Sequence, residues 1–248
     1  MIIGLIDSGI GGFSILRATQ KALPHHMYVY LADQANFPYS QRSTKNLIEL
    51  AKEHARVLIE KHNCSLIVLA CNTLSVAALA AVRTAFPDTR FIGTVPPVNV
   101  AAKSLGNDAN ILVLSSERTA KSEYLQQLLE NLSGPNWEIL GSTDLVEAIE
   151  AGDAAKVKQV LTAIRDSYPK ITFSGIVLGC THFPLVANEM QETWPDAELF
   201  SPSDGVVKQL KQISPVEPTE QLSSTPLFLT TPDYSSSLQL EKRYHATL

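Results

Sequence analysis

One nine-residue pattern occurs twice in the chain, and each copy has a cysteine at the same place. The stretch "SLIVLACNT" begins at Ser65 and "SGIVLGCTH" begins at Ser174, so that Cys71 and Cys180 are separated by the same 109 residues (180 − 71 = 109). Both copies are apolar runs without polar alternation, which is typical of parallel strands buried on both faces. The repeat predicts two similar α/β units, each with a thiol where a strand ends.

Apolar runs of this kind alternate with helix-like segments along most of the chain. The strand-like runs are residues 1–7, 27–33, 64–71, 90–95, 110–116, 137–142 and 173–180. The helix-like segments are residues 43–62, 74–85, 119–131 and 153–167. This alternation predicts an α/β fold with mostly parallel central sheets.

The pattern is interrupted at Pro96 and Pro97, after which a new series of strands and helices begins. We therefore expect two pseudo-symmetric α/β domains, the first formed by residues 1–97 plus about 207–248 and the second by residues 98–206. The late apolar run "TPLFLTT" is expected to return along the edge of an existing sheet.

Charge and cysteine content exclude several classes of protein. The formal net charge is −5, and no Lys/Arg cluster suited to a phosphate backbone is present, which argues against a nucleic-acid partner. No apolar run reaches the roughly 18–20 residues of a membrane span, and no signal-peptide pattern opens the chain. Three dispersed cysteines fit a reducing compartment. These features predict a cytoplasmic protein that acts on a small molecule.

The residues that follow Cys71 and Cys180 suggest chemistry at both thiols. Each cysteine is followed by small polar residues, "NT" and "TH", where a helix is expected to begin. Free backbone N–H groups at a helix N-terminus favour a thiolate, and His182 is a candidate proton partner. Because ligands of parallel sheets bind at the carboxyl ends of strands, the two units could present their thiols to one cleft. Cys64, at the start of its strand, is expected to be an ordinary buried residue.

The glycine-rich stretch "IDSGIGGFS" suggests a dinucleotide site, with Asp33 as a ribose-binding acid, but the fingerprint fails. Ser14 stands where the third glycine is required, and Asp7 precedes the turn where a pyrophosphate would lie. Asp7 is better interpreted as a strand-end carboxylate that points into the cleft. The sequence also has no zinc-ligand spacing and no Gly-x-Ser-x-Gly elbow, and no lysine has the residues that would support a pyridoxal phosphate Schiff base.

Two opposed acid/base thiols have a specific use. Inversion of a stereocentre needs a base on one face of a carbon and an acid on the other, and thiols can exchange these roles because their pKa lies near neutrality. Two alternatives remain from the residues alone. One is a hydrolase or transferase with a single nucleophilic cysteine and His182 as its base. The other is a binding protein without turnover.

Four motifs together resemble one family. "DSGIGG", "LADQANFPY", "VLACNT" and "VLGCTHFPL", which span residues 7–185 in that order, are similar to the glutamate racemases of the cofactor-independent aspartate/glutamate racemase superfamily. The resemblance implies that Cys71 and Cys180 are the acid/base pair, with Asp7 assisting the first and His182 the second. It also implies that L- and D-glutamate are bound by Asp7, Ser8, Tyr39, Ser40, Asn72, Thr73, Thr119, Thr181 and His182.

The same resemblance implies no cofactor and no metal, a homodimer, an active site in the cleft between the two domains, and production of D-glutamate for peptidoglycan. The chain departs from the family pattern at several positions. Ser40 replaces a glycine, Val95 an acidic residue and Ser116 a threonine, and "SPSDG" replaces a more regular ending. Glu150 lies near an acidic residue of the family, but its surroundings match poorly. These departures leave a racemase-like binding protein, with another substrate such as aspartate or without turnover, as the alternative.

Overall fold

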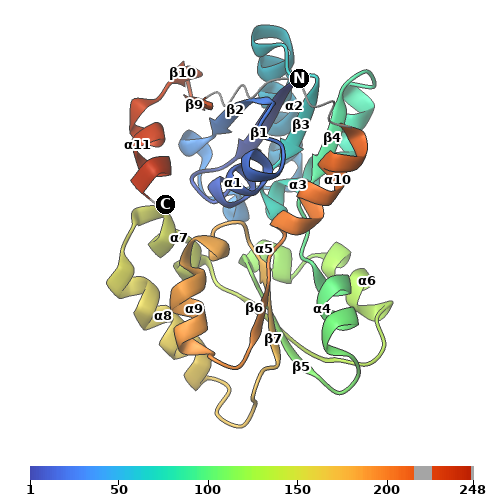
Figure 1. The fold of residues 1–248 in the computed structure, drawn as a ribbon, viewed down its shortest axis with the longest axis vertical. Helices are drawn as coiled ribbons and strands as arrows, with labels where there is room; N and C mark the ends of the chain where they lie inside the picture. Colours follow the sequence, from blue (N-terminus) through green and yellow to red (C-terminus); the bar gives the residue numbers. More distant parts are fainter. Residues whose placement is uncertain (215–224, 247–248) are drawn as a thin grey trace. The chain divides into compact units, whose positions relative to one another are not determined.

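The computed structural model describes residues 1–214 and 225–246, which form two units (Figure 1). Unit 1 comprises Met1–Thr94 and Ser203–Leu248, and unit 2 comprises Val95–Pro202. The boundaries expected from the sequence lie after residues 97 and 206, a few residues later than those of the structure. Unit 1 is thus assembled from two separate stretches of chain.

Unit 1 is built on a six-stranded sheet, sheet A, whose strand order is β10-β9-β2-β1-β3-β4. All neighbouring strands are parallel except β10 and β9. The strands are β1 (Ile2–Asp7), β2 (Met27–Ala32), β3 (Leu66–Leu69), β4 (Arg90–Gly93), β9 (Leu227–Thr230) and β10 (Ser235–Ser236). Residues 225–231 were expected to return to an existing sheet, and this is confirmed. Strand β9 pairs with β2, on the side of β2 that faces away from β1.

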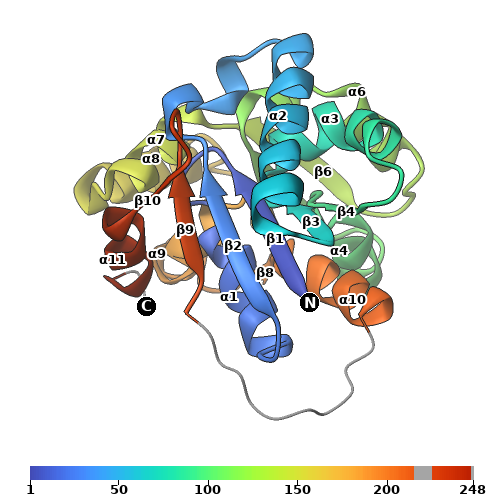
Figure 2. The ribbon, with the colours of Figure 1, turned by 90° about the horizontal axis from the view of Figure 1, so that it is seen from above.

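Helices cover both faces of sheet A because each strand is apolar on both sides. Val29 and Leu31 pack into one core with α2 (Thr44–His62) and α3 (Asn72–Ala85), and Figure 2 shows α2 in front of the sheet. On the opposite side Tyr30 packs against α1 (Phe13–Ala22) and Phe228 against α11 (Leu238–Ala246), while α10 (Ser203–Ile213) packs against α1. The alternation of Tyr30 with its neighbours follows the two-residue period of a strand.

Local sequence explains the limits of α2, which was expected over residues 43–62. Ser43 is its N-cap, and the Ser43 hydroxyl accepts a hydrogen bond from the Asn46 amide. The helix ends at Asn63, which adopts the left-handed conformation (φ 52°) that asparagine tolerates better than most residues. Within the described ranges, the structure contains no helix long and apolar enough to cross a membrane.

Unit 2 is built on a four-stranded parallel sheet, sheet B, with the order β6-β5-β7-β8. Its strands are β5 (Asn110–Ser115), β6 (Asn136–Gly141), β7 (Gly175–Gly179) and β8 (Glu198–Phe200). Its helices are α4 (Val98–Leu105), α5 (Glu117–Ala120), α6 (Glu123–Glu130), α7 (Thr143–Ala151), α8 (Ala154–Asp166), η3 (Phe183–Val186) and α9 (Ala187–Thr193). In Figure 1, α4 and α6 lie on one side of this sheet and α8 and α9 on the other.

The two sheets repeat one topology. The order β2-β1-β3-β4 in sheet A matches β6-β5-β7-β8 in sheet B, so that β3 corresponds to β7 and β1 to β5. The duplicated sequence patterns are therefore equivalent strands of equivalent units. This confirms the predicted fold class of two α/β domains with mostly parallel sheets.

The prediction of a single helix over residues 119–131 is wrong, because the helix is interrupted. The structure has two short helices, α5 and α6, separated at Lys121 and Ser122. The Ser122 hydroxyl accepts a hydrogen bond from the Leu125 amide, and Ser122 is therefore the N-cap of α6. A serine favours a helix start over a helix interior because its hydroxyl competes for backbone groups.

Candidate functional site

The predicted site residues fall into two groups, one in each unit, and each group lies where parallel strands end. The Cys71 half-site contains Asp7 and Ser8 after β1, the Tyr39–Ser40 turn after β2, and Cys71, Asn72 and Thr73 after β3. The Cys180 half-site contains Thr119 after β5 and Cys180, Thr181 and His182 after β7. Both are at the edge of a sheet where ligands of α/β proteins bind.

Cys71 is the N-cap of α3, a helix of 14 residues, as the sequence predicted. Its side chain is 8% exposed. The free N–H groups and the partial positive charge of the helix N-terminus favour the thiolate form at this position. Backbone geometry alone therefore supplies electrostatic support to the thiol.

Asn72 has a buried amide group that forms no hydrogen bond with the described residues. The residue is 2% exposed, and neither Oδ1 nor Nδ2 has a hydrogen-bond partner among the described residues. Leaving a buried amide unpaired costs about 1–3 kcal/mol per group. Such groups are expected where a ligand completes the hydrogen bonds, and Asn72 lies next to Cys71.

Asp7 is fully buried and organises the glycine-rich turn. Its Oδ1 accepts a hydrogen bond of 2.8 Å from the Gly9 amide. The Tyr30 hydroxyl donates to the Gly9 carbonyl at 2.7 Å, so the turn is held from two sides. The carboxylate is thus fixed at the end of β1, in the unit that also contains Cys71.

Gly12 allows this turn to lie against the sheet. A methyl group at Gly12 would lie 2.7 Å from the Tyr30 hydroxyl and 2.9 Å from Asp7 Cβ. We expect Gly12→Ala to lower the free energy of unfolding by about 1–3 kcal/mol, the usual cost of overpacking. Urea denaturation of the purified protein measures this change.

Gly205→Ala is the matched control, because a methyl group there would have no neighbour within 4 Å. Gly205 lies inside α10, where alanine should be neutral or stabilise the protein by roughly 0.5–1 kcal/mol. Equal effects of the two substitutions would show that the close approach at Gly12 is unimportant.

The Tyr39–Ser40 turn forms the short helix η2 (Tyr39–Gln41), which packs against α3. Tyr39 is buried and donates a hydrogen bond of 2.9 Å to Asp33 Oδ2, whereas Ser40 is half-buried. Burial, then the charge of Asp33 and the hydrogen bond to it, raise the pKa of Tyr39 well above 10, and the charges of Cys71 and Asp7 add to this effect. Asp33 is therefore engaged with side chains of its own unit, which agrees with rejection of the ribose-binding interpretation.

Sequence reasoning missed Ser75, which joins two strand ends of this half-site. Its hydroxyl donates to the Leu69 carbonyl (2.9 Å) and accepts from the Thr94 amide (2.8 Å). The Thr94 hydroxyl is buried and has no partner in the described part of the chain. A serine in the first turn of a helix after a strand is the signal that could have identified this link.

Cys180 follows β7 directly, but it does not begin an α-helix as expected. Residues 180–182 form a turn that leads into η3, a 3₁₀-helix of four residues, and α9 begins only at Ala187. Pro184 lies in the first turn of η3, a position that proline tolerates because the N–H group it lacks would have no partner within the helix there. The surroundings of the two thiols therefore differ. Cys71 lies at the N-terminus of a long helix, and Cys180 does not.

His182 supplies the positive charge at Cys180 that a helix supplies at Cys71. Its Nδ1 is 3.7 Å from Cys180 Sγ, and its Nε2 is 2.8 Å from Glu150 Oε2. Burial alone would lower the pKa of His182, but the hydrogen bonds and charges of Cys180 and Glu150 outweigh burial and raise the pKa well above 6.5. The result is a Cys180–His182–Glu150 chain in which Cys180 and His182 are buried and Glu150 is partly exposed. Glu150, in α7, had no assigned role from the sequence.

The remaining residues of the Cys180 half-site are small and buried. Thr119 and Thr181 are each 1% exposed. The Ser116 hydroxyl donates to the Thr119 hydroxyl at 3.1 Å and caps α5. Serine therefore performs the capping role at position 116, where a threonine was expected. Val95, the other departure, is half-buried and contributes no polar side chain.

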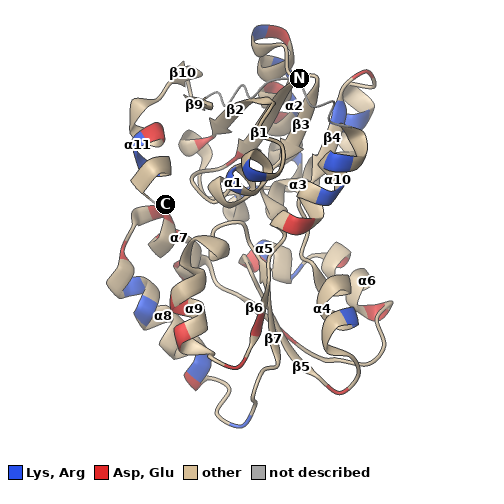
Figure 3. Ribbon diagram, viewed as in Figure 1, with Lys and Arg blue, Asp and Glu red and all other residues tan. Residues whose placement is uncertain are grey.

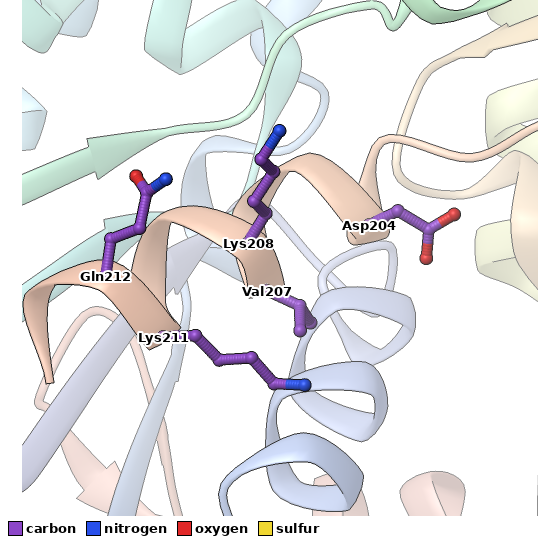
Figure 4. A pocket seen from close by; sticks show the side chains of 5 residues that line it. All are labelled: Asp204, Val207, Lys208, Lys211 and Gln212. Atoms are coloured by element: carbon purple, nitrogen blue, oxygen red, sulfur yellow. The ribbon is translucent and has the colours of Figure 1, made fainter. Parts of the chain in front are cut away.

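Features outside the two half-sites do not indicate a particular ligand. Asp204, Val207, Lys208, Lys211 and Gln212 line an open hollow of about 440 Å³ along α10 (Figure 4). Figure 3 shows that basic and acidic residues are interspersed on the outer helices of both units. In residues 1–214 and 225–246, no three His, Cys, Asp or Glu side chains converge in a way that could hold a metal ion.

Comparison with known proteins identifies racemases, both by family model and by sequence identity. The family model described as "Asp/Glu/Hydantoin racemase" matches residues 14–210. The glutamate racemase of Actinobacillus pleuropneumoniae serotype 3 (strain JL03) is 35% identical over 228 residues, which cover 87% of this chain and 84% of that protein.

Solved structures with the same fold are also glutamate racemases. Escherichia coli glutamate racemase, in complex with L-glutamate and the activator UDP-MurNAc-ala, superposes with a TM-score of 0.86 at 27% identity, covering 98% of this chain and 94% of that one. The glutamate racemase of Campylobacter jejuni superposes with a TM-score of 0.81 at 26% identity, covering 99% and 97% of the two chains.

Proposed function

The chain belongs to the Asp/Glu/hydantoin racemase family and is an amino-acid racemase of the glutamate racemase type, and we propose that it interconverts L- and D-glutamate with two cysteines and no cofactor. The observation that carries the proposal is the equivalence of the two thiols. Cys71 and Cys180 follow corresponding strands, β3 and β7, in sheets of the same topology.

The proposed reaction moves one proton at a time. The thiolate of one cysteine removes the proton from Cα of glutamate and becomes a thiol. The thiol of the other cysteine then donates its proton to the opposite face of Cα and becomes a thiolate. Atoms and charge balance over the cycle, but the two cysteines have exchanged protonation states. The reverse reaction begins from that exchanged state.

The two half-sites support their thiols in different ways. At Cys71 the N-terminus of α3 favours the thiolate, and Asp7 is proposed as the assisting carboxylate. At Cys180 the His182 imidazolium, held by Glu150, is proposed to favour the thiolate and to shuttle the proton. The raised pKa of His182 supports this role because it keeps the ring charged at neutral pH.

Substrate binding is proposed for the polar groups around the thiols. The amide of Asn72, which has no hydrogen-bond partner in residues 1–214 and 225–246, supports this assignment because it offers a donor and an acceptor beside Cys71. Backbone N–H groups at the start of α3 suit a carboxylate for the same electrostatic reason that they suit a thiolate. The proposed binding residues are Asp7, Ser8, Tyr39, Ser40, Asn72, Thr73, Thr119, Thr181 and His182.

The wider setting follows from the family and is part of the proposal. We propose that the enzyme works in the cytoplasm as a homodimer and that its D-glutamate is used in peptidoglycan synthesis. Loss of turnover is not favoured, since both thiols, His182 and the buried polar groups beside them are present.

Isotope exchange tests the reaction directly. Incubation of the protein with L-glutamate in heavy water, without pyridoxal phosphate, is expected to give D-glutamate that carries deuterium at Cα. Chiral chromatography with mass spectrometry measures both changes. L-Aspartate is the comparison substrate. If both amino acids remain unlabelled and unconverted, the racemase proposal is wrong, and tight binding without exchange would identify a binding protein instead.

A further inference from the structure

The carboxylate of Asp33 is fully buried, and side chains from four separate positions meet at it. Oδ2 accepts a hydrogen bond from the Tyr39 hydroxyl (2.9 Å) and lies 2.9 Å from His54 Nε2. Oδ1 accepts from the Thr231 hydroxyl (2.6 Å) and from Asn36 Nδ2 (3.0 Å). An ionised carboxylate can only accept, so each of these groups donates to it.

The network extends to the C-terminal hairpin formed by β9 and β10. His54 Nδ1 lies 3.0 Å from the Tyr234 hydroxyl, and that hydroxyl donates to Glu53 Oε1 at 2.8 Å. The His54 and Tyr234 rings are also in contact, with their centroids 5.7 Å apart. Thr231 and Tyr234 thus attach the hairpin to α2 and to Asp33, although about 180–200 residues separate the partners in sequence.

The ionised form of the Asp33 carboxylate is strongly favoured over the protonated form by these partners. Burial would raise the pKa of Asp33, but the hydrogen bond and charge of His54, with the hydrogen bonds of Thr231 and Asn36, lower it to about 2. Charge-assisted hydrogen bonds of this kind are stronger than neutral ones. Asp33 is therefore a fixed anchor at physiological pH.

Asp33 is bonded to two of the three segments that form the Cys71 half-site. Through its side chain Asp33 holds Tyr39, which begins η2 and precedes Ser40. Through its backbone amide it donates to the Asp7 carbonyl at 2.8 Å. Since η2 packs against α3, the helix that begins after Cys71, a displacement of Tyr39 would change how the Tyr39–Ser40 turn lies against that helix.

We propose that Asp33 is a positioning residue for the Cys71 half-site, and that Thr231 and Tyr234 of the C-terminal hairpin hold it in place. The inference rests on the proposed function, because it assigns the Tyr39–Ser40 turn to substrate binding. In this arrangement the end of the chain sets the affinity for the amino acid without touching it.

The test removes one hydroxyl at the hairpin. Thr231→Val keeps the shape of the side chain but takes one donor from Asp33 Oδ1. We expect KM for glutamate to rise about 10-fold while kcat changes little, because the loss of a hydrogen bond to the Asp33 carboxylate loosens the turn proposed to bind glutamate but leaves both thiols unchanged. Tyr234→Phe should have the same effect with smaller size, and Thr231→Ser should restore the KM of the unmodified protein.

Thr230→Val is the matched control. Thr230 is the neighbouring residue, and its hydroxyl is 3.2 Å from Gln34 Oε1 in an exposed pair rather than bonded to Asp33. KM should stay within about twofold of the unmodified value, as for most substitutions away from buried polar groups. A loss of stability alone would lower the amount of folded enzyme and leave KM unchanged, so the split between KM and kcat separates positioning from stability.

Hydrogen exchange gives a readout that does not depend on activity. The amides of Gln41 and Arg42 bond to the Pro38 and Tyr39 carbonyls within the turn. Thr231→Val should speed their exchange, and Thr230→Val should not. Faster exchange in a protein that does not racemise glutamate would support the positioning role and overturn the proposed function. Unchanged exchange together with unchanged KM in Thr231→Val would overturn the positioning role.

Discussion

Replacing either Cys71 or Cys180 with serine is expected to lower racemisation by at least about 10²–10⁴-fold, the contribution usually credited to one acid–base group. A model thiol has a pKa of about 8.5, whereas an alcohol is almost never ionised near pH 7. Each variant therefore lacks one of the two proton carriers. Circular dichroism and coupled assays of D-glutamate formation measure the loss.

The loss must be equal in both directions when expressed as kcat/KM, because L- and D-glutamate have the same free energy in water. Racemisation kinetics therefore cannot show which cysteine serves which enantiomer. A glutamate analogue with a leaving group on Cβ avoids this restriction, since its elimination needs only removal of the Cα proton.

The two serine variants should show opposite preferences for the D and L forms of this analogue. Cys71→Ser retains the Cys180 base and should process one form, and Cys180→Ser should process the other. Cys64→Ser is the control, because burial raises the pKa of Cys64 to about 12 and the residue lies at the other end of β3, away from the half-site. Identical preferences in the two variants would show that the thiols do not divide the faces of Cα.

The second large effect is expected at His182. His182→Gln removes the imidazolium that lies beside Cys180, and we expect elimination by Cys180 to fall about 10²-fold, which is a larger loss than that of elimination by Cys71. Chiral forms of the same analogue measure the two activities separately. Glu150→Gln keeps a hydrogen-bond partner for His182 but removes its charge, so it should give a smaller loss in the same direction.

The pH dependence of Cys180-dependent elimination follows from the protonation of His182. Because the pKa of His182 is raised, the ring stays charged through neutral pH and loses its proton only as the pH rises through that raised value. Cys180-dependent elimination should therefore fall as the pH rises through the pKa of His182, and His182→Gln, which has no charge to lose, should lack this fall. An unchanged profile would show that His182 does not assist Cys180.

The sheets and the positions of the thiols could be predicted from the sequence because buried parallel strands are continuous apolar runs. The repeat that ends at Cys71 and Cys180 also identified the equivalent strands β3 and β7. These features depend on local pattern and on one internal comparison, both of which a single chain provides.

The environment of each thiol could not be predicted in the same way. Cys180 is followed by a turn and the short helix η3 instead of the α-helix that its sequence suggested. Glu150 reaches His182 from another helix, and Thr231 reaches Asp33 from the other end of the chain. Such contacts join residues far apart in sequence, and no local periodicity encodes them.

The divided construction of unit 1 has a consequence for the order in which the protein is made. A ribosome produces all of unit 2 before it produces β9, which is the neighbour of β2 in sheet A. Since domains fold as units during synthesis, the Cys180 half-site can form while the Cys71 half-site still lacks Thr231 and Tyr234. The half that begins first in the sequence is therefore the last to be finished. A nascent chain that stops short of the hairpin would hold one supported thiol and one whose supporting turn is not yet anchored.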